Sequence, residues 1–354
     1  MIAAEACSLA GMLDQLRPHV PAALISDAAW TRVQGMAGQV PAALPRVVGL
    51  ECRLAHDART DLALGLEPAG GALLAGGGSW VAPGTPEHPV WERIRSFCRP
   101  RGAGSGLTAE ETLSIWLEFD DVGDAAEGPV SLPVPGIFIE IAPALRGEAA
   151  RTACLAFVTR VIGELAGEHA VASLSAPLRH CFSALPSGAC VPGFGFFPGR
   201  AASAVRVNVS CPDAARLVLY LQAVGWPGEA NVLRSTLAEA ARARGRTGCD
   251  APEQIHFDLA PHVLPRLGLE YFLARTPQAN GTLVEARFLD ALVSRGLCTP
   301  GKRAALHAWP GTSLTAFAHT LWVSRVRRLV HHLKLVCEGG IPVEAKAYLG
   351  IYQV

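Results

Sequence analysis

The strongest constraint on the fold is a repeated pair of short runs in which two kinds of side chain alternate. In one run, Ile115, Leu117 and Phe119 alternate with Trp116 and Glu118. Side chains point to opposite faces along a β-strand, so each run predicts a strand with one aliphatic face and one charged or aromatic face. A sheet of such strands needs helices over its aliphatic face, and its other face has to meet water or a ligand.

The pattern occurs five times, with helical stretches between the pairs. The predicted strand pairs lie at about 47–67, 113–142, 191–210, 254–274 and 332–352. A last helix, near 314–329, is predicted to lead into the fifth pair. Ten antiparallel strands favour closure, because a barrel has no exposed strand edge. We therefore expect an α+β fold in one domain, residues 1–354, with a closed antiparallel ten-stranded barrel of repeated αββα units and helices outside.

The faces opposite the aliphatic ones are predicted to line the lumen of this barrel, because they share one phase along each strand. They carry charged, polar and aromatic side chains: Glu51, Arg53, Trp116, Glu118, Phe138, Glu140, Arg206, Asn208, His256, Asp258, Glu270, Phe272, Lys334, Lys346, Tyr348 and Tyr352. The lumen is therefore expected to be polar and aromatic, with acids about as numerous as bases.

Composition argues against several classes of partner. Lys plus Arg and Asp plus Glu both number 31, so nothing predicts a surface for nucleic acid. Glu5 lies where a secretion signal carries positive charge, and no apolar run is long enough to span a bilayer. The ten cysteines are scattered, without a Cys-x-x-Cys pair, which fits buried free thiols. We expect a cytoplasmic protein with no membrane partner.

On these residues the chain resembles the ABBA or PT-barrel aromatic prenyltransferases, which include the dimethylallyltryptophan synthases. In that family a first-strand glutamate holds the aromatic acceptor, and the segments Leu-Glu-Cys-Arg (50–53) and Leu-Glu-Pro (66–68) are similar to its motif. The family binds prenyl diphosphate through alternating Arg, Lys and Tyr, to which Arg-Val-Asn-Val-Ser (206–210) and Lys-Ala-Tyr (346–348) are similar. The resemblance implies transfer of a prenyl group from an allylic diphosphate to an aromatic, peptide or other natural-product acceptor.

Two strands depart from the family pattern. Ala63 and Gly65 stand on the second strand, where the family has an arginine, and Phe138 and Glu140 replace a lysine on the fourth. A diphosphate carries more negative charge than a balanced lumen attracts, unless local clustering of cations or a Mg²⁺ ion adds to the attraction. No cofactor is certain from the sequence.

The charged candidates each have two interpretations. Lys346, Lys334 and Arg206 are candidates to bind the diphosphate and stabilise charge on the leaving group. Alternatively they pair with lumen carboxylates, because buried charges need partners. Glu51 and Glu118 are candidates to orient or deprotonate the acceptor. Alternatively they balance lumen cations.

The remaining lumen residues are candidates to bind substrate. The rings of Trp116, Phe138, Tyr348 and Tyr352 either shield an allylic cation or fill the barrel by packing. The polar candidates are Arg53, Glu140, Asn208, His256, Asp258 and Glu270.

Two further motifs are interpreted as structural. Residues 120–124, Asp-Asp-Val-Gly-Asp, match the aspartate motif of magnesium-dependent isoprenoid enzymes, but they follow a strand, so we expect a solvated hairpin tip. His331 and His332 follow the basic segment 325–328 at the end of the last predicted helix, where cations cap a helix C-terminus.

Two alternatives to prenyl transfer stay open. One is a different enzyme on the same barrel that uses Glu118, Glu140 and Asp258 with His256 for acid–base chemistry on a small molecule or peptide. The other is a non-catalytic barrel that binds a ligand or peptide.

Overall fold

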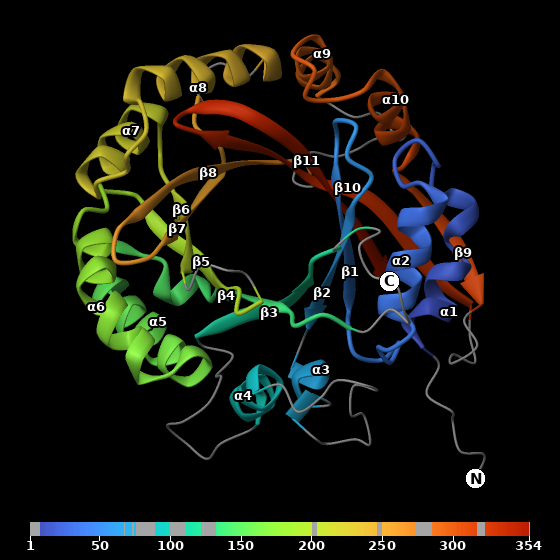
Figure 1. The fold of residues 1–354 in the computed structure, drawn as a ribbon, viewed down its shortest axis with the longest axis horizontal. Coiled ribbons are helices and arrows are strands. Elements are labelled where there is room, and N and C mark those ends of the chain that lie inside the picture. The colour runs from blue at the N-terminus through green and yellow to red at the C-terminus, as the bar shows by residue number, and fades with distance from the viewer. Residues whose placement is uncertain are drawn as a thin grey trace.

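A closed antiparallel barrel surrounded by helices forms the centre of the protein (Figure 1). The computed structural model describes residues 8–66, 68–72, 74–75, 89–99, 111–121, 123, 132–199, 204–245, 250–273, 285–316 and 323–353. The strands of the barrel are β1 (Val47–Arg53), β2 (Thr60–Leu66), β3 (Thr112–Phe119), β4 (Gly136–Ile141), β5 (Cys190–Phe196), β6 (Val205–Ser210), β7 (Gln254–Leu259), β8 (Val263–Phe272), β10 (Val323–Glu338) and β11 (Ile341–Gln353). β11 pairs with both β1 and β10, which closes the sheet. The predicted ten-stranded barrel is confirmed.

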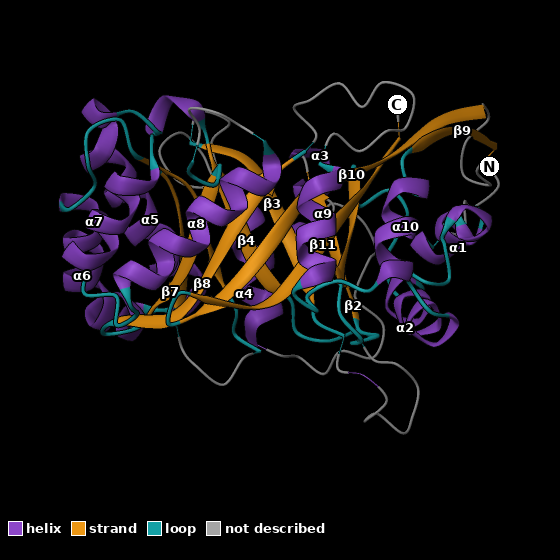
Figure 2. Ribbon diagram, turned by 90° about the horizontal axis from the view of Figure 1, so that it is seen from above, coloured by secondary structure: helices purple, strands orange, loops and turns teal. Residues whose placement is uncertain are grey.

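The helices form a ring outside the barrel (Figures 1 and 2). They are α1 (Leu9–Asp14), α2 (Asp27–Ala37), α3 (Pro68–Ala72), α4 (Pro89–Cys98), α5 (Arg151–Ala166), α6 (Glu168–Ser183), α7 (Ala214–Ala223), α8 (Ala230–Arg244), α9 (Ala286–Ser294) and α10 (Pro300–Ala308), with 3-10 turns at Arg17–His19, Pro143–Leu145 and Glu148–Ala150. In the described part of the chain, no helix combines the length and the apolar character that crossing a membrane requires.

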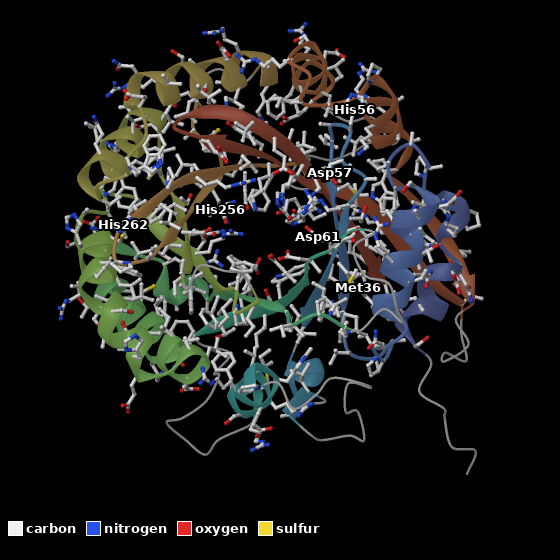
Figure 3. All side chains as sticks on the ribbon, viewed as in Figure 1. Met36, His56, Asp57, Asp61, His256 and His262 are labelled. Atoms are coloured by element: carbon white, nitrogen blue, oxygen red, sulfur yellow. The ribbon has the colours of Figure 1, made fainter. Side chains whose placement is uncertain are left out.

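The outward faces of the strands bury the aliphatic residues that define the pattern. Leu50, Leu117 and Val207 are at most 1% exposed in the layer between barrel and helices. α2 contacts β2, α5 contacts β5 and α8 contacts β11. The core is therefore a shell around the barrel, and the polar faces of the strands are turned inward, as Figure 3 shows for Asp61 and His256.

The prediction of a helix at 314–329 is wrong. Gly311–Ala316 form β9, residues 317–322 lie outside the described residues, and β10 begins at Val323. Val326, Arg328 and Val330 are buried while Arg325 and Arg327 are exposed, so burial here alternates with the period of a strand. β10 extends past the barrel, and β9 pairs with this extension at the edge of the molecule (Figure 2). Pairing with both β9 and β11 outweighs the helical propensity of the segment.

Asp121 joins three elements, and its expected place at a solvated hairpin tip is wrong. Its carboxylate accepts hydrogen bonds from Arg32 Nε and Nη2 on α2 and from the backbone amides of Thr60 and Gly123. Its own amide donates to Asp61 Oδ1. The Asp121 side chain is 1% exposed, so this aspartate is structural. The other motif residues at 122 and 124, and Glu67 of the Leu-Glu-Pro segment, lie outside the described residues.

Replacing Asp121 with alanine is expected to destabilise the protein by about 3 kcal/mol, because it leaves the Arg32 guanidinium and the Thr60 amide without their buried partner. Urea unfolding measures the loss. Asp290→Ala, which removes the exposed partner of Arg303, is the control and should change stability by less than about 0.5 kcal/mol. Equal effects of the two substitutions would contradict the structural role of Asp121.

Candidate active site

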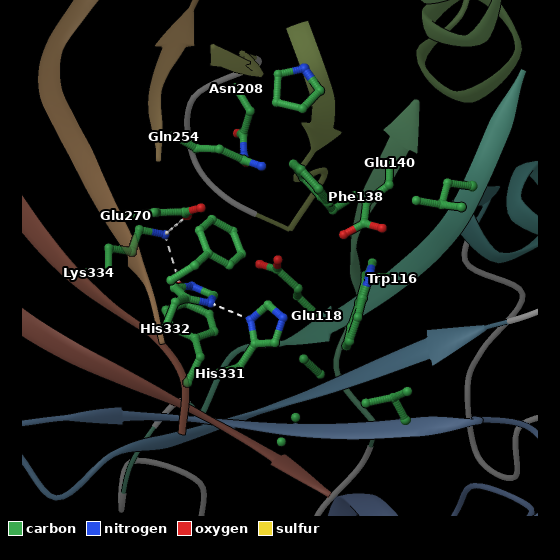
Figure 4. A pocket seen from close by; sticks show the side chains of 18 of the residues that line it. Trp116, Glu118, Phe138, Glu140, Asn208, Gln254, Glu270, His331, His332 and Lys334 are labelled. Carbon is green, nitrogen blue, oxygen red and sulfur yellow. Dashed lines mark hydrogen bonds and ion pairs between the residues drawn. The ribbon is translucent and has the colours of Figure 1, made fainter. Parts of the chain in front are cut away.

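A cavity of about 270 Å³ lies in the lumen (Figure 4). It lies toward the end where β3 and β7 begin and β4 and β8 end. Many of the predicted lumen residues line it: Trp116, Glu118, Phe138, Glu140, Arg206, Asn208, Glu270, Lys334, Tyr348 and Tyr352. The inward phase predicted for these side chains is confirmed. The volume is slightly below the roughly 300–1,000 Å³ of typical ligand pockets, so it suits small ligands.

Glycines on neighbouring strands make room for the aromatic wall of the cavity. A Cβ atom at Gly65 on β2 would lie 3.0 Å from the Trp116 ring. On β5, a Cβ at Gly193 or Gly195 would lie within 3.1 Å of the Phe138 ring. The small residues that replace the family's second-strand arginine are thus explained by packing, because Trp116 occupies that space.

An acidic group lies beside this wall. The Trp116 indole N–H donates to Ser114 Oγ at 3.1 Å, and the Ser114 hydroxyl donates to Glu140 Oε2 at 2.7 Å. These bonds fix the Glu140 carboxylate at the edge of the cavity. Glu118 extends from the same strand as Trp116, and Figure 4 shows both carboxylates directed into the cavity.

Lys334 and Arg206 are the cations of the opposite wall, and both have acidic neighbours. Lys334 Nζ lies 2.9 Å from the Tyr348 hydroxyl and 3.5 Å from Glu270 Oε1. Burial lowers the pKa of Lys334 and raises that of Glu270. Arg206 donates from Nε and Nη2 to the two carboxylate oxygens of Asp258, at 2.9 and 3.1 Å.

A group of charged residues, here called the floor, lies in the lumen beneath the cavity. Lys346 Nζ contacts Glu51 Oε1 at 2.6 Å, and Arg53 Nη2 contacts Asp61 Oδ2 at 2.9 Å. Glu344 lies 3.7 Å from Arg53 and 3.8 Å from Lys346. These residues do not line the cavity. The ion-pair interpretation, which the sequence had left open, therefore holds for Lys346, Glu51 and Arg53.

Two of the three carboxylates beneath the cavity, Glu51 and Asp61, have pKa values shifted in opposite directions. Burial opposes the charge of Glu51, but the ammonium groups of Lys346 and Lys334 outweigh it and hold the Glu51 pKa well below its usual range. Burial and the nearby Glu51 charge raise the pKa of Asp61 to about 7, although Arg53 opposes the shift. Asp61 was not among the predicted site residues, because the sequence analysis of strand 61–67 considered only its small residues, Ala63 and Gly65.

His256 lies near the floor as well. It is 6% exposed, and its Nε2 is 3.7 Å from Glu270 Oε1 without a hydrogen bond. Burial, with the positive charges of Lys334 and Arg206, holds the His256 pKa well below normal. Gly268 on the neighbouring strand leaves room for its ring, since a Cβ there would lie 1.7 Å from Nε2.

The lining also contains polar residues that were not assigned to the site from the sequence, among them Arg146, Gln254, His331 and His332. Gln254 accepts a hydrogen bond from Asn208 Nδ2 at 3.1 Å. His331 and His332 lie at an irregularity of β10 and face the cavity, so the predicted helix-capping role is wrong. Among the described residues, no group of three or more His, Cys, Asp and Glu side chains is arranged to hold a metal ion.

Several solved structures resemble the protein over nearly its whole length, among them two dimethylallyltryptophan synthases and PriB. The 5-dimethylallyltryptophan synthase from Streptomyces coelicolor has a TM-score of 0.53 and 17% identity, covering 98% of both chains. The 6-dimethylallyltryptophan synthase from Micromonospora olivasterospora, in complex with DMASPP and Trp, has a TM-score of 0.54 and 13% identity, covering 97% of this chain and 96% of that chain. PriB, in a binary complex with product diphosphate, has a TM-score of 0.52 and 16% identity, covering 96% and 94%.

The protein has the aromatic prenyltransferase barrel fold. No family model matches the sequence, and no curated protein matches it. The likeness to the prenyltransferase barrels is therefore one of fold.

Replacing Lys346 with methionine is expected to destabilise this prenyltransferase barrel by about 3 kcal/mol at neutral pH, because Glu51 loses its buried partner. The lowered Glu51 pKa stabilises the native state fully above the usual value of 4.5, and this contribution is lost as pH falls through the lower folded-state pKa. The deficit should therefore shrink in acid.

Urea unfolding of Lys346→Met between neutral and acidic pH measures this deficit. The double variant Lys346→Met with Glu51→Gln is the control and should recover part of the stability, because no charge is left unpaired. A deficit that does not change with pH would contradict the assigned ion pair.

Proposed function

We propose that the protein transfers a prenyl group from an allylic diphosphate to a small nucleophilic acceptor inside the barrel. The observation that carries this proposal is a cavity, within a prenyltransferase barrel, whose opposite walls present cations and carboxylates with aromatic rings between them. Proteins of this fold have been solved with DMASPP and Trp and with product diphosphate, which supports the same pair of substrate classes here.

The donor diphosphate is assigned to the wall formed by Lys334, Arg206 and Tyr348. Asp258 takes two donors of Arg206, and the third nitrogen, Nη1, is left for a second acceptor. The Tyr348 hydroxyl accepts a hydrogen bond from Lys334 and is hydrogen-bonded to Glu51, so it holds the ammonium group of Lys334 in position. These donors are fixed before the substrate binds, so they stabilise the charge that develops on the leaving group without rearrangement.

The aromatic rings are assigned to the allylic group. Trp116, Phe138, Tyr348 and Tyr352 all border the cavity. Their ring faces attract positive charge and exclude water, which would otherwise capture the allylic cation.

The acceptor is assigned to Glu118 and Glu140, whose carboxylates enter the cavity from the wall opposite Lys334. A carboxylate there accepts an N–H or O–H of the acceptor and orients its nucleophilic atom. Glu51, the first-strand glutamate, lies beneath the cavity and binds Lys346. We assign it the role of holding the charged floor in place.

A second function is supported by the charge balance of the lumen. Carboxylates exceed cations among the described residues of the lumen and the cavity lining: Glu51, Asp61, Glu118, Glu140, Asp258, Glu270 and Glu344 face Arg53, Arg146, Arg206, Lys334 and Lys346. Such a lumen favours a cationic small molecule, either bound without reaction or acted on by acid–base chemistry.

Isothermal calorimetry with dimethylallyl and geranyl diphosphates, each with and without Mg²⁺, tests the donor site. The wild-type protein is expected to bind at least one of them. Lys334→Met should weaken binding by about ten-fold or more, because a charge-assisted bond is lost, while Lys334→Arg should retain most of it. Arg303→Met, on the outer helix α10, is the matched control. Absence of binding under every condition would remove the prenyltransferase proposal and favour the cationic ligand.

Replacing Glu118 with glutamine is expected to lower the turnover number by about 10²-fold while leaving the dissociation constant of the diphosphate nearly unchanged. A carboxylate that orients the acceptor acts mainly in the transition state, and the amide keeps its size. Product formation measured by mass spectrometry, with calorimetry on the same variant, separates the two effects. A loss confined to diphosphate affinity would contradict the assignment.

A further inference from the structure

We propose that the acceptor carries an ammonium group, which binds to the carboxylate of Glu140 at the wall of the cavity formed by β3 and β4. The inference rests on the proposed prenyl transfer, because it names the class of acceptor for that reaction. An ammonium nitrogen has no free lone pair, so the atom that attacks the prenyl group is another atom of the same molecule.

The Glu140 carboxylate is at the cavity without a cation beside it. The residue lies on β4, borders the cavity and is partly buried, and Figure 4 shows its carboxylate directed into the cavity. With the residues that the structure describes, Glu140 makes one hydrogen bond, from the Ser114 hydroxyl, and no ion pair. A carboxylate has roughly four acceptor positions, so most of those of Glu140 are open to a ligand. A charge in an enclosed site is stabilised by an opposite charge, which favours a cationic ligand.

This carboxylate is positioned before a ligand binds. Ser114 and Glu140 are opposite each other in the pairing of β3 with β4. The Trp116 indole N–H donates to Ser114 Oγ at 3.1 Å, and the Ser114 hydroxyl donates to Glu140 Oε2 at 2.7 Å. A preorganised acceptor lowers the conformational entropy that binding costs.

Aromatic rings stand around the same carboxylate. Trp116 and Phe138 are opposite each other two positions further along β3 and β4, and both border the cavity. Tyr352 of β11 borders it too. Burial raises the pKa of Tyr352, and the negative charge of Glu140 raises it further, against the effect of Arg327, so Tyr352 is close to Glu140. Ring faces attract cations, and rings grouped around an anion suit an alkylammonium group.

The cations that line the cavity are engaged elsewhere. Arg206 and Lys334 contact carboxylates of their own wall. Arg146 donates from Nε to the Ile141 carbonyl oxygen at 2.7 Å. Within the described part of the chain, none of these cations forms an ion pair with Glu140. A ligand ammonium group therefore has no internal cation to displace.

Glu118 marks the other end of the acceptor. Burial opposes the charge of Arg206, but Asp258 and, to a smaller extent, Glu118 raise its pKa. Glu118 is therefore near the wall assigned to the diphosphate. With the ammonium group at Glu140, the nucleophilic atom is assigned to Glu118, toward the prenyl donor. One carboxylate binds the acceptor and the other orients the atom that reacts.

Calorimetry with three ligands that share an indole ring tests the ammonium site. At neutral pH tryptamine carries an ammonium group, 3-ethylindole is neutral and indole-3-acetate is an anion. The wild-type protein is expected to bind tryptamine about ten-fold more tightly than 3-ethylindole, because a charge-assisted hydrogen bond is added. Indole-3-acetate should bind more weakly than either. Equal affinities for the three ligands, or no detectable binding of tryptamine, would overturn the inference.

Replacing Glu140 with glutamine removes the charge and keeps an oxygen that accepts the Ser114 hydroxyl. This variant should lose the preference for tryptamine and bind 3-ethylindole nearly as the wild type does. Glu92→Gln, on the exposed face of the outer helix α4, is the matched control and should keep the preference. If Glu140 only holds Ser114 in place, Glu140→Gln keeps the preference as well, and that result would overturn the inference.

Calorimetry with dimethylallyl thiolodiphosphate separates this inference from the proposed function. Tryptamine and the thiolodiphosphate should bind together, because donor and acceptor occupy opposite walls. Mutual exclusion of the two ligands would place the ammonium group in the donor site and overturn the inference. If the diphosphate binds but tryptamine is not preferred, the ammonium site alone fails. If tryptamine is preferred but no prenyl diphosphate binds, the proposed function fails, and the bound ammonium compound is then a ligand and no acceptor.

Discussion

The charged side chains inside the barrel pair with one another, because the closed sheet and its helical cover largely separate them from bulk water. Arg53 pairs with Asp61, Lys346 with Glu51, and Arg206 with Asp258. Leaving one such partner out costs several kcal/mol, so these pairs fix the strand registers that bring them together. The cavity lies on the side of the lumen where the pairs leave space, and aromatic rings line that side.

The same constraint shapes the proposed chemistry. A diphosphate that enters this lumen meets cations that already have carboxylate neighbours, so its attraction comes from the remaining N–H donors of Arg206 and Lys334. The carboxylates assigned to the acceptor come from other strands, β3 and β4, although Glu118 is near enough to Arg206 and Tyr348 to raise the pKa of both. The barrel can therefore hold an anionic donor and a nucleophilic acceptor at opposite walls with aromatic rings between them, which is the arrangement that group transfer through an allylic cation requires.

Much of this architecture could be predicted from the sequence, because the alternation of side chains is a local property. It gave the strand pairs, the closed barrel and the inward phase of residues such as Glu118, Glu140 and Lys334. The predictions that were wrong concern residues whose structure depends on contacts between distant segments of the chain. The segment 323–329 is a strand because β9 and β11 pair with it, and no local pattern reveals that pairing. Asp121 is buried only because Arg32 approaches from α2.

The site was predicted less completely, for the same reason. Strand phase says which side chains face the lumen, but the depth of each residue and the identity of its partner follow from register across the barrel. Glu51 and Lys346 face inward as expected, and yet they form the floor. His331 and His332 were missed because a register shift between β10 and β11 has no signal in the sequence of one strand.

The most direct test of the account is a crystal structure of the protein with a non-hydrolysable allylic thiolodiphosphate. The account predicts the diphosphate beside Arg206, Lys334 and Tyr348, with the allylic chain between Trp116 and Tyr348 in the cavity. A ligand bound outside the barrel, or a diphosphate placed against Glu118 and Glu140, would contradict it.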